Sequence, residues 1–190
     1  MTRIPALFVL SFLVLLSNSH LLTAETFDQN PRRHLRSTDR RLIRLVHDGV
    51  RTSETFRRLV DRIRHSDVVV YLDCSGGGST GGRLTFVSSV GGFRYLHVRV
   101  ARLPNADTQI ALIGHELQHA VEIADAPDIV DAVSLAREYQ RIGFASPRVE
   151  PGLSFDSDAA VDTGYRVLRE LTGRQPAQLP SDLQLLNGAY

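Results

Sequence analysis

The sequence predicts a single α+β domain, with a small antiparallel sheet of about three strands packed against about five helices. Alternating and β-branched runs are confined to residues 67–101, whereas helical spacing of apolar residues dominates before and after them. The chain of 190 residues is long enough for one hydrophobic core. No internal repeat or composition break in the sequence indicates a second domain.

The first 24 residues have the layout of a secretory signal peptide. Arg3 gives a positive start, the segment Ile4–Leu16 is almost wholly apolar, and Ala24 is a small residue suited to cleavage. A membrane anchor is the alternative, but the apolar run is shorter than the roughly 20 residues that span a bilayer. We therefore expect cleavage after Ala24 and a secreted or periplasmic protein, with no stable membrane insertion once the signal is removed.

The region from 25 to 64 is rich in arginine. Residues 25–37 are polar and predict a flexible lead-in, so the domain is expected to cover 38–175. A helix near Thr38–His47 should end at Gly49, and a second helix should begin at the capping residue Ser53. Eleven arginines and four acidic residues fall between 32 and 64, and this excess of positive charge could form a basic patch that binds acidic lipid or nucleic acid. Solvated helix faces explain the same pattern, and the net charge of +1 argues against a nucleic-acid partner.

Three strands are predicted in the middle of the chain. The run DVVVYLD at 67–73 has the composition of a buried strand. RLTFVSS at 83–89 and FRYLHVRVA at 93–101 follow, joined through a pair of glycines. The glycine-rich stretch at 74–82 lacks the lysine of a phosphate-binding loop and predicts a flexible connection. Its first residue, Cys74, is the only cysteine, so no intrachain disulfide can form.

Three further helices are predicted, at 106–124, 128–142 and 156–171. Asn105 or Asp107 can cap the first of these, and Pro127 separates it from the second. Residues 143–155 are predicted to form a loop, and residues 176–190 are predicted to form a loosely ordered tail.

The stretch Ile113–Ile123, IGHELQHAVEI, carries the candidate chemistry. His115 and His119 are one helical turn apart and present two imidazoles that one metal ion can bridge. Glu116 is rotated by about 100° and is poorly placed to bind the same ion, but it can reach a water held there. Hydrogen-bonded core histidines are the alternative. Because burying two histidines and a glutamate is costly unless they are paired or ligated, a metal site is favoured.

The motif HELQHAVE resembles the active-site helix of the zincin metallopeptidases and is close to the HELTHAV form of the thermolysin-like gluzincins. The longer combination of TFRRLVDRIRHSDVVVYLD, a hairpin and GHELQHAVEIADAP resembles uncharacterised secreted bacterial HExxH proteins, over most of the mature chain. The resemblance implies a zincin-like fold, Zn²⁺ as cofactor and Glu116 as general base. Residues 120–125 lack the glycine and third histidine that a metzincin requires.

In gluzincins the third zinc ligand is a glutamate on a later helix, and the acidic residues of this chain in the corresponding region are the aspartates of the segment 154–164. Asp156 is the first candidate because it falls nearer the apolar side of the predicted helix. Asp158 is the alternative, since Asp158 and Asp162 repeat the acidic spacing of thermolysin-like enzymes. Glu122 is expected to support the ligands rather than bind the ion.

A hydrolase of this kind also needs a group that stabilises the oxyanion, and Tyr139, Tyr165 and His97 are available for this role. The sequence thus predicts a secreted zinc-dependent metallopeptidase acting on a peptide or protein substrate. A non-catalytic binding or assembly protein with a structural metal, or a metal-dependent hydrolase of another amide, are the alternatives. The sequence leaves the oligomeric state open.

Overall fold

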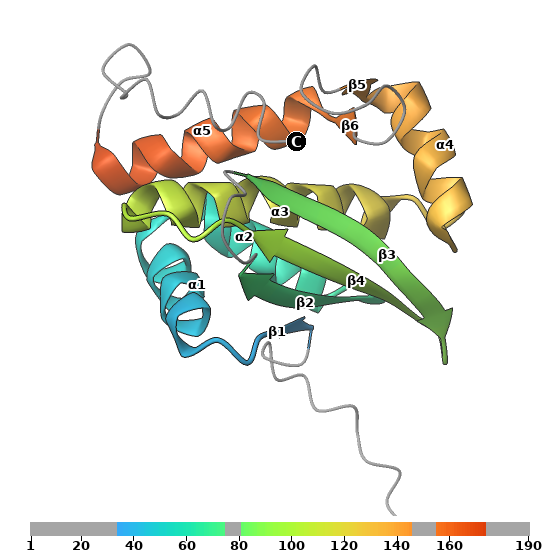
Figure 1. Ribbon diagram of the computed structural model, residues 1–190, viewed down its shortest axis with the longest axis horizontal. Coiled ribbons are helices and arrows are strands. Elements are labelled where there is room, and N and C mark those ends of the chain that lie inside the picture. The colour runs from blue at the N-terminus through green and yellow to red at the C-terminus, as the bar shows by residue number, and fades with distance from the viewer. Residues whose placement is uncertain (1–33, 75–80, 146–154, 174–190) are drawn as a thin grey trace, which may run out of the picture.

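The computed structural model describes residues 34–74, 81–145 and 155–173 (Figure 1). The predicted signal peptide at 1–24, residues 25–33 of the lead-in and the tail at 176–190 lie outside these ranges. The elements are β1 (Leu35–Arg36), α1 (Arg40–Thr52), α2 (Glu54–Arg64), β2 (Val68–Cys74), β3 (Gly82–Val90), β4 (Phe93–Val100), α3 (Ala106–Asp125), α4 (Ala132–Ile142), β5 (Phe144–Ala145), β6 (Phe155–Asp156) and α5 (Asp158–Thr172).

The α+β class is confirmed, but the expectation of an antiparallel three-stranded sheet is wrong. The main sheet has four strands in the order β1-β2-β4-β3, with β2 parallel to both β1 and β4. Within this sheet, only β3 and β4 pair antiparallel, through a turn in which Gly91 and Gly92 adopt φ of 61° and 78°. Strand β4 thus has an antiparallel neighbour, β3, on one side and a parallel neighbour, β2, on the other. The two residues of β1, expected within the flexible lead-in, pair with β2.

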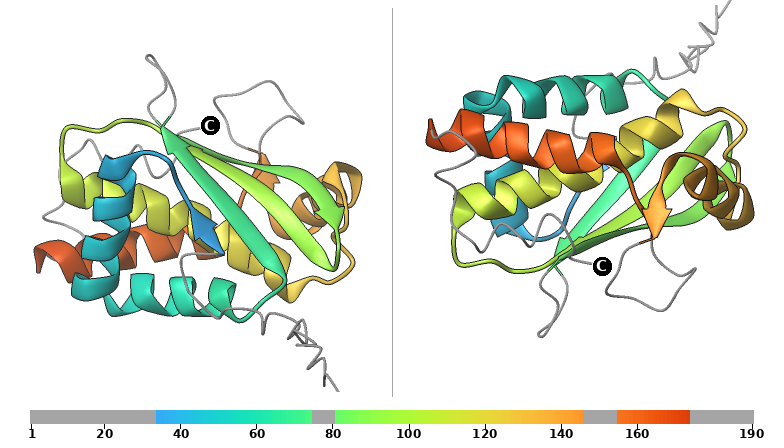
Figure 2. Two further views of the ribbon diagram at one scale, coloured as in Figure 1. Left: turned by 90° about the horizontal axis from the view of Figure 1, so that it is seen from below. Right: turned by 90° about the horizontal axis from the view of Figure 1, so that it is seen from above.

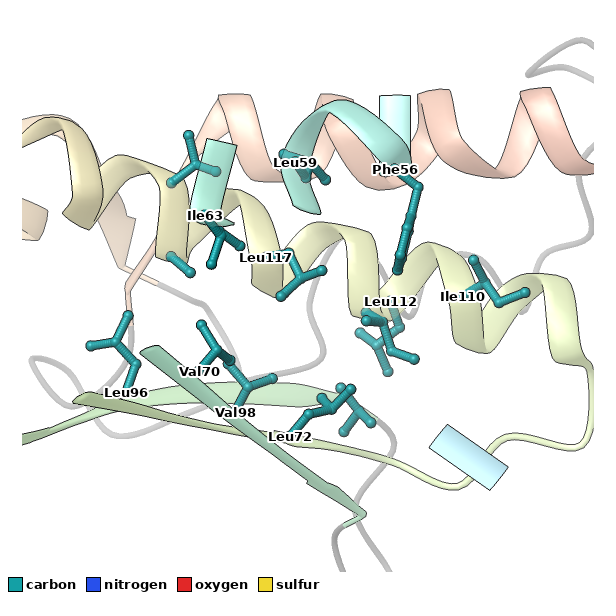
Figure 3. Close-up of a cluster of buried hydrophobic side chains, with 14 of the residues drawn as sticks. Phe56, Leu59, Ile63, Val70, Leu72, Leu96, Val98, Ile110, Leu112 and Leu117 are labelled. Atoms are coloured by element: carbon teal, nitrogen blue, oxygen red, sulfur yellow. The ribbon is translucent and has the colours of Figure 1, made fainter. Parts of the chain in front are cut away.

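Helix α3 lies between the sheet and α5, as Figures 1 and 2 show. Its apolar residues therefore meet protein on more than one side, and Leu112 and Leu117 are almost fully buried. Beneath them, alternate residues of β2 and β4 form the other half of the core (Figure 3). None of the described helices is long and apolar enough to cross a bilayer.

Helix α1 does not end at Gly49 as the sequence predicted, but continues to Thr52. A Cβ at Gly49 would lie 2.9 Å from Phe56 Cδ1 and 3.0 Å from Ile110 Cγ2. The glycine therefore permits the close approach of α2 and α3 to α1 rather than terminating the helix. Helix α2 begins as expected after Ser53, whose hydroxyl accepts a hydrogen bond from the Phe56 amide.

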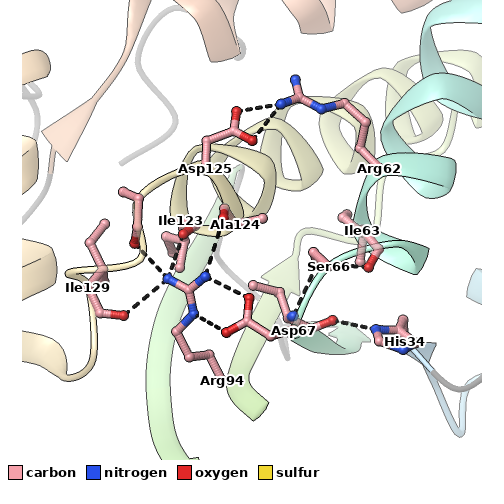
Figure 4. Close-up of polar contacts among 12 residues, drawn as sticks. His34, Arg62, Ile63, Ser66, Asp67, Arg94, Ile123, Ala124, Asp125 and Ile129 are labelled. Carbon is pink, nitrogen blue, oxygen red and sulfur yellow. Dashed lines mark hydrogen bonds and ion pairs between the residues drawn. The ribbon is translucent and has the colours of Figure 1, made fainter. Parts of the chain in front are cut away.

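A buried arginine fixes the carboxyl end of α3 to the sheet (Figure 4). Arg94 on β4 is only 4% exposed, and its Nε and Nη2 each donate to one Asp67 carboxylate oxygen at 2.7 Å. Its terminal nitrogens also donate to the carbonyl oxygens of Ile123, Ala124, Ala126 and Ile129. These carbonyls include groups that the end of a helix leaves without partners. Arg94 therefore sets where α3 stops and how it is oriented on the sheet.

Candidate metal centre

The middle of α3 supplies three polar side chains to the protein interior. The helix begins where the Asn105 side chain accepts from the Thr108 amide, one of the two predicted caps. Three turns later His115 and Glu116 are 0% exposed and His119 is 4% exposed. The two imidazole rings lie 5.0 Å apart, centroid to centroid, at an interplanar angle of 80°. The helical spacing therefore places both histidines side by side, as the sequence predicted.

Asp156 completes this cluster from a distant part of the chain. It is the last residue of β6, which pairs with β5, and it directly precedes Ser157, the cap of α5. Its Oδ1 lies 3.3 Å from His115 Nε2 and 3.4 Å from His119 Nε2, and the residue is 2% exposed. The sequence had placed Asp156 in the first turn of a helix. Because α5 begins only at Asp158, Asp156 is an extended residue.

The three residues can hold a metal ion. Their ligand atoms all lie within 4.8 Å of one another, and all three residues are buried. Ligands about 2.0–2.2 Å from a tetrahedral zinc ion are separated from each other by about 3.3–3.6 Å. The two measured separations between Asp156 and the histidines fall in this range. Two imidazole nitrogens and one carboxylate oxygen also form a donor set that zinc accepts, with a fourth position left over.

A second carboxylate contacts His119 on the ring nitrogen that does not face Asp156 and thereby orients the ring. Glu122 Oε2 lies 2.9 Å from His119 Nδ1, so Nε2 of the same ring is left to face Asp156. The Tyr139 hydroxyl donates to Glu122 Oε2 at 2.8 Å and lies at the same distance from His119 Nδ1. Ser157 Oγ donates to Glu122 Oε1 at 2.6 Å. The supporting role expected of Glu122 agrees with this geometry.

Glu116 lies beside the cluster without taking part in it. Neither of its carboxylate oxygens has a hydrogen-bond partner in the described part of the chain, although both are buried. The carboxylate lies against Gly82 at the start of β3, where an added Cβ would come within 2.7 Å of Glu116 Cδ. Burial raises the pKa of this carboxyl from its ordinary 4.5 to about 8, against the charge of His119.

The electrostatics of the cluster suit a cation. Burial lowers the pKa of His115 and favours the neutral imidazole that a metal requires. Burial would also lower the pKa of His119, but the hydrogen bonds that its ring donates to the carboxylates of Asp156 and Glu122 outweigh it and raise this pKa to about 10. The same two histidines hold the pKa of Asp156 below its usual range despite its burial. Binding of a metal ion by these histidines would therefore compete with binding of a proton.

Three other predicted residues do not join the cluster. Asp158, the alternative ligand, is exposed in the first turn of α5. Tyr165 is partly buried against the hydrophobic core, and among the described residues no hydrogen bond joins it to the cluster. His97 pairs instead with Asp73 at 2.8 Å. It alternates along β4 with the buried Leu96 and Val98, so it lies on the sheet face that points away from the helices.

Two residues near the cluster were not expected from the sequence. Ser157 caps α5 and at the same time bonds Glu122, while its amide donates to Asp156 Oδ1 at 2.7 Å. The one indication of Ser157 in the sequence is its residue type, because serine is a preferred residue at the N-terminal cap of a helix. Gly82 makes room for the Glu116 carboxylate, but it falls in a glycine-rich stretch that the sequence assigned to a flexible connection. No pattern within that stretch distinguishes Gly82 from its neighbours.

Comparisons with protein-family models, with curated proteins and with solved structures find no match for this chain. The functional interpretation therefore depends on the geometry of the cluster and on the chemistry of its side chains.

Proposed function

We propose that the protein is a zinc-dependent hydrolase of peptide bonds. The observation that carries this proposal is the Glu116 carboxylate, which is buried beside His115, His119 and Asp156 and has no hydrogen-bond partner among the described residues. A buried carboxylate in this state costs stability unless it has another use. A function in catalysis accounts for its retention, because active sites hold groups that packing alone would disfavour.

Each residue has a separate part in the proposed reaction. A zinc ion held by the two imidazoles and Asp156 would supply Lewis acidity, polarising the peptide carbonyl and making water more acidic. Glu116 accepts a proton from the water that attacks the carbonyl carbon. As the C–N bond breaks, the carboxyl can return that proton to the leaving nitrogen. A carboxyl pKa raised by burial suits both the acceptance and the return of a proton near neutral pH.

Glu122 and Tyr139 support the cluster in this scheme. Their hydrogen bonds hold the His119 ring in one orientation and one tautomer. Tyr139 is also a sequence-based candidate for stabilising the oxyanion, but its hydroxyl already donates to Glu122. We therefore assign Tyr139 to positioning His119. The peptide or protein substrate is part of this proposal. A location outside the cytoplasm is also part of it, because the signal peptide predicted at residues 1–24 lies outside the described residues.

A structural metal site in a non-catalytic protein is the second candidate. The observation that favours it is the burial of Glu116, which is 0% exposed, because a catalytic base must meet its substrate. The two candidates differ in what they require of this carboxylate. A purely structural site needs only the three ligands, whereas a hydrolase also needs Glu116.

The Glu116→Gln variant separates the two candidates. The amide keeps the volume of the side chain but cannot accept the proton. We expect the zinc content, measured by mass spectrometry of the metal, to stay unchanged, while cleavage of a mixed pool of fluorogenic peptides falls by about 10²- to 10⁴-fold. His115→Ala should lose both zinc and activity.

Glu54→Gln is the matched control, since Glu54 is 58% exposed on α2 and pairs with Arg58. It should change neither measurement. If Glu116→Gln cleaves peptides at the rate of the unaltered protein, Glu116 is not the base. If the unaltered protein binds zinc stoichiometrically and cleaves none of the peptides, the structural candidate is favoured instead.

A further inference from the structure

A second candidate site lies near the edge of the sheet that is opposite to the edge contacted by Glu116. Glu116 contacts β3, which forms one edge of the sheet, whereas β1 forms the opposite edge. A cavity of about 620 Å³ opens between β1, α1 and α2. This volume is within the range of about 300–1,000 Å³ that is typical of small-molecule sites. None of the residues of the candidate metal centre lines this cavity.

The lining is mainly aliphatic. Helix α1 contributes Ile43, Val46 and Val50, which recur at the spacing of one helical face. The residues that α1 buries in the core are next to this face, at Leu42, Leu45 and Gly49. Val46 and Val50 also pack partly against the core, whereas Ile43 is 39% exposed, so the apolar surface of α1 continues from the core to the cavity. Leu35 of β1 and Val60 of α2 extend the same apolar lining.

Half of the six polar residues of the lining are arginines. Three arginines contribute to the cavity, Arg36 from β1 and Arg57 and Arg64 from α2, whereas Asp61 is the only carboxylate. Arg57 donates to the Val50 carbonyl, and Arg36 donates to the Tyr71 hydroxyl. The Nε of Arg64 is buried and has no hydrogen-bond partner in the described part of the chain. This Nε is shielded from solvent, but the Arg64 side chain as a whole is only partly buried and lines the cavity. Its positive charge is therefore available to an anion in the cavity.

We propose that this cavity binds an anionic amphiphile with a single aliphatic chain. The chain would lie along Ile43, Val46 and Val50, and the carboxylate or phosphate head would accept from Arg64. A nucleic acid fits less well, because the aliphatic lining offers no partner for its polar bases. The three arginines of the cavity belong to the arginine-rich segment 32–64, for which the sequence allowed a patch that binds acidic lipid. The proposal does not depend on the metal centre.

Calorimetric titration of the full chain in a metal-chelating buffer tests this proposal. The ligands are dodecanoate, dodecyl phosphate, dodecanol and dodecylamine, each below its aggregation threshold. We expect the two anions to bind about 10-fold or more tightly than the alcohol and the amine, because a hydrogen bond to a charged group is lost without the anionic head. Tighter binding of dodecanoate would indicate a fatty acid as the source of the head, and tighter binding of dodecyl phosphate a monoacyl phospholipid.

Two variants locate the binding. Arg64→Gln should weaken both anions by about 10-fold and leave the alcohol unchanged. Val46→Phe should fill the cavity and weaken all chains. Arg58→Gln is the matched control on the same helix, since Arg58 is 75% exposed and does not line the cavity. Thermal unfolding checks that each variant is folded. Absence of binding, equal binding of all four ligands, or equal effects of Arg64→Gln and Arg58→Gln would overturn the proposal.

Discussion

Helix α3 carries two buried polar clusters that differ in one respect. At its carboxyl end, Arg94 is 4% exposed, and each nitrogen of its guanidinium has an acceptor among the described residues. In its middle, Glu116 is fully buried, and neither carboxylate oxygen has a donor there. The same helix therefore meets one buried charged group whose partners are all supplied by the protein, and carries another that has no partner among the described residues.

The comparison distinguishes polar groups that stabilise a fold from those kept for another use. Buried charges are tolerated when protein groups replace the lost water, as the carboxylate of Asp67 and four carbonyls do around Arg94. Around Glu116, the backbone of Gly82 makes room for the carboxylate without neutralising it. Burial alone thus says little about function, whereas burial without a partner among the described residues makes Glu116 a candidate for a functional role.

Arg94→Met should give the largest effect on stability. The change leaves several buried carbonyls at the end of α3 without their donor, and each unsatisfied buried acceptor typically costs about 1–3 kcal/mol. Loss of the pair with Asp67 adds less, because the Asp67 side chain is 41% exposed. The free energy of unfolding in urea, measured on metal-free protein, checks this. Arg51→Met is the control, because Arg51 and Asp48 are 72% and 51% exposed and their pair should contribute less than about 0.5 kcal/mol. Similar losses in the two variants would contradict the structural role of Arg94.

Glu116→Gln should act in the opposite direction and stabilise the metal-free protein at alkaline pH. The folded protein binds the Glu116 proton up to a pKa of about 8, whereas the unfolded chain releases it near 4.5. The contribution of this carboxyl to stability is therefore complete below pH 4.5 and is lost as the pH rises through 8. Near pH 9 the variant should be more stable by up to about 3 kcal/mol.

The same gain should shrink towards pH 5, where the folded protein keeps the Glu116 carboxyl protonated. Thermal unfolding in a chelating buffer at the two pH values measures the difference. Glu54→Gln provides the control, since this exposed carboxylate should show no such pH dependence. A Glu116→Gln variant that is less stable than the unaltered protein near pH 9 would mean that the carboxylate is satisfied in solution.

Tyr139→Phe should give the smallest effect, on the metal affinity alone. The change removes the hydroxyl that bonds Glu122 and His119, but the direct contact between Glu122 and His119 remains. We expect zinc to bind about 10-fold more weakly, at the lower end of the effect of such supporting groups. Competition with a chromophoric chelator measures this. Tyr165→Phe is the control, and an equal loss in both variants would show that Tyr139 does not position His119.

Local sequence predicted the parts of the site that lie within one helix. His115 and His119 share a face of α3 because their spacing matches the helical repeat. The apolar face of the helix predicted from Asp156 onwards favours Asp156 over Asp158, but Asp156 lies in β6, outside that helix. Its position depends instead on the pairing of β6 with β5 and on the packing of α5 against α3, which no local pattern encodes.

The sequence by itself determined that the chain forms an α+β domain and that two histidines and a glutamate lie in the middle of a buried helix, because periodicity and capping are local properties. Only the tertiary structure decided the mixed order of the sheet and the choice of Asp156 as the third member of the cluster. It also decided that α1 continues through Gly49 and that Gly82 faces Glu116. These features depend on contacts between residues far apart in the chain, where shape and hydrogen-bond satisfaction outweigh local propensity.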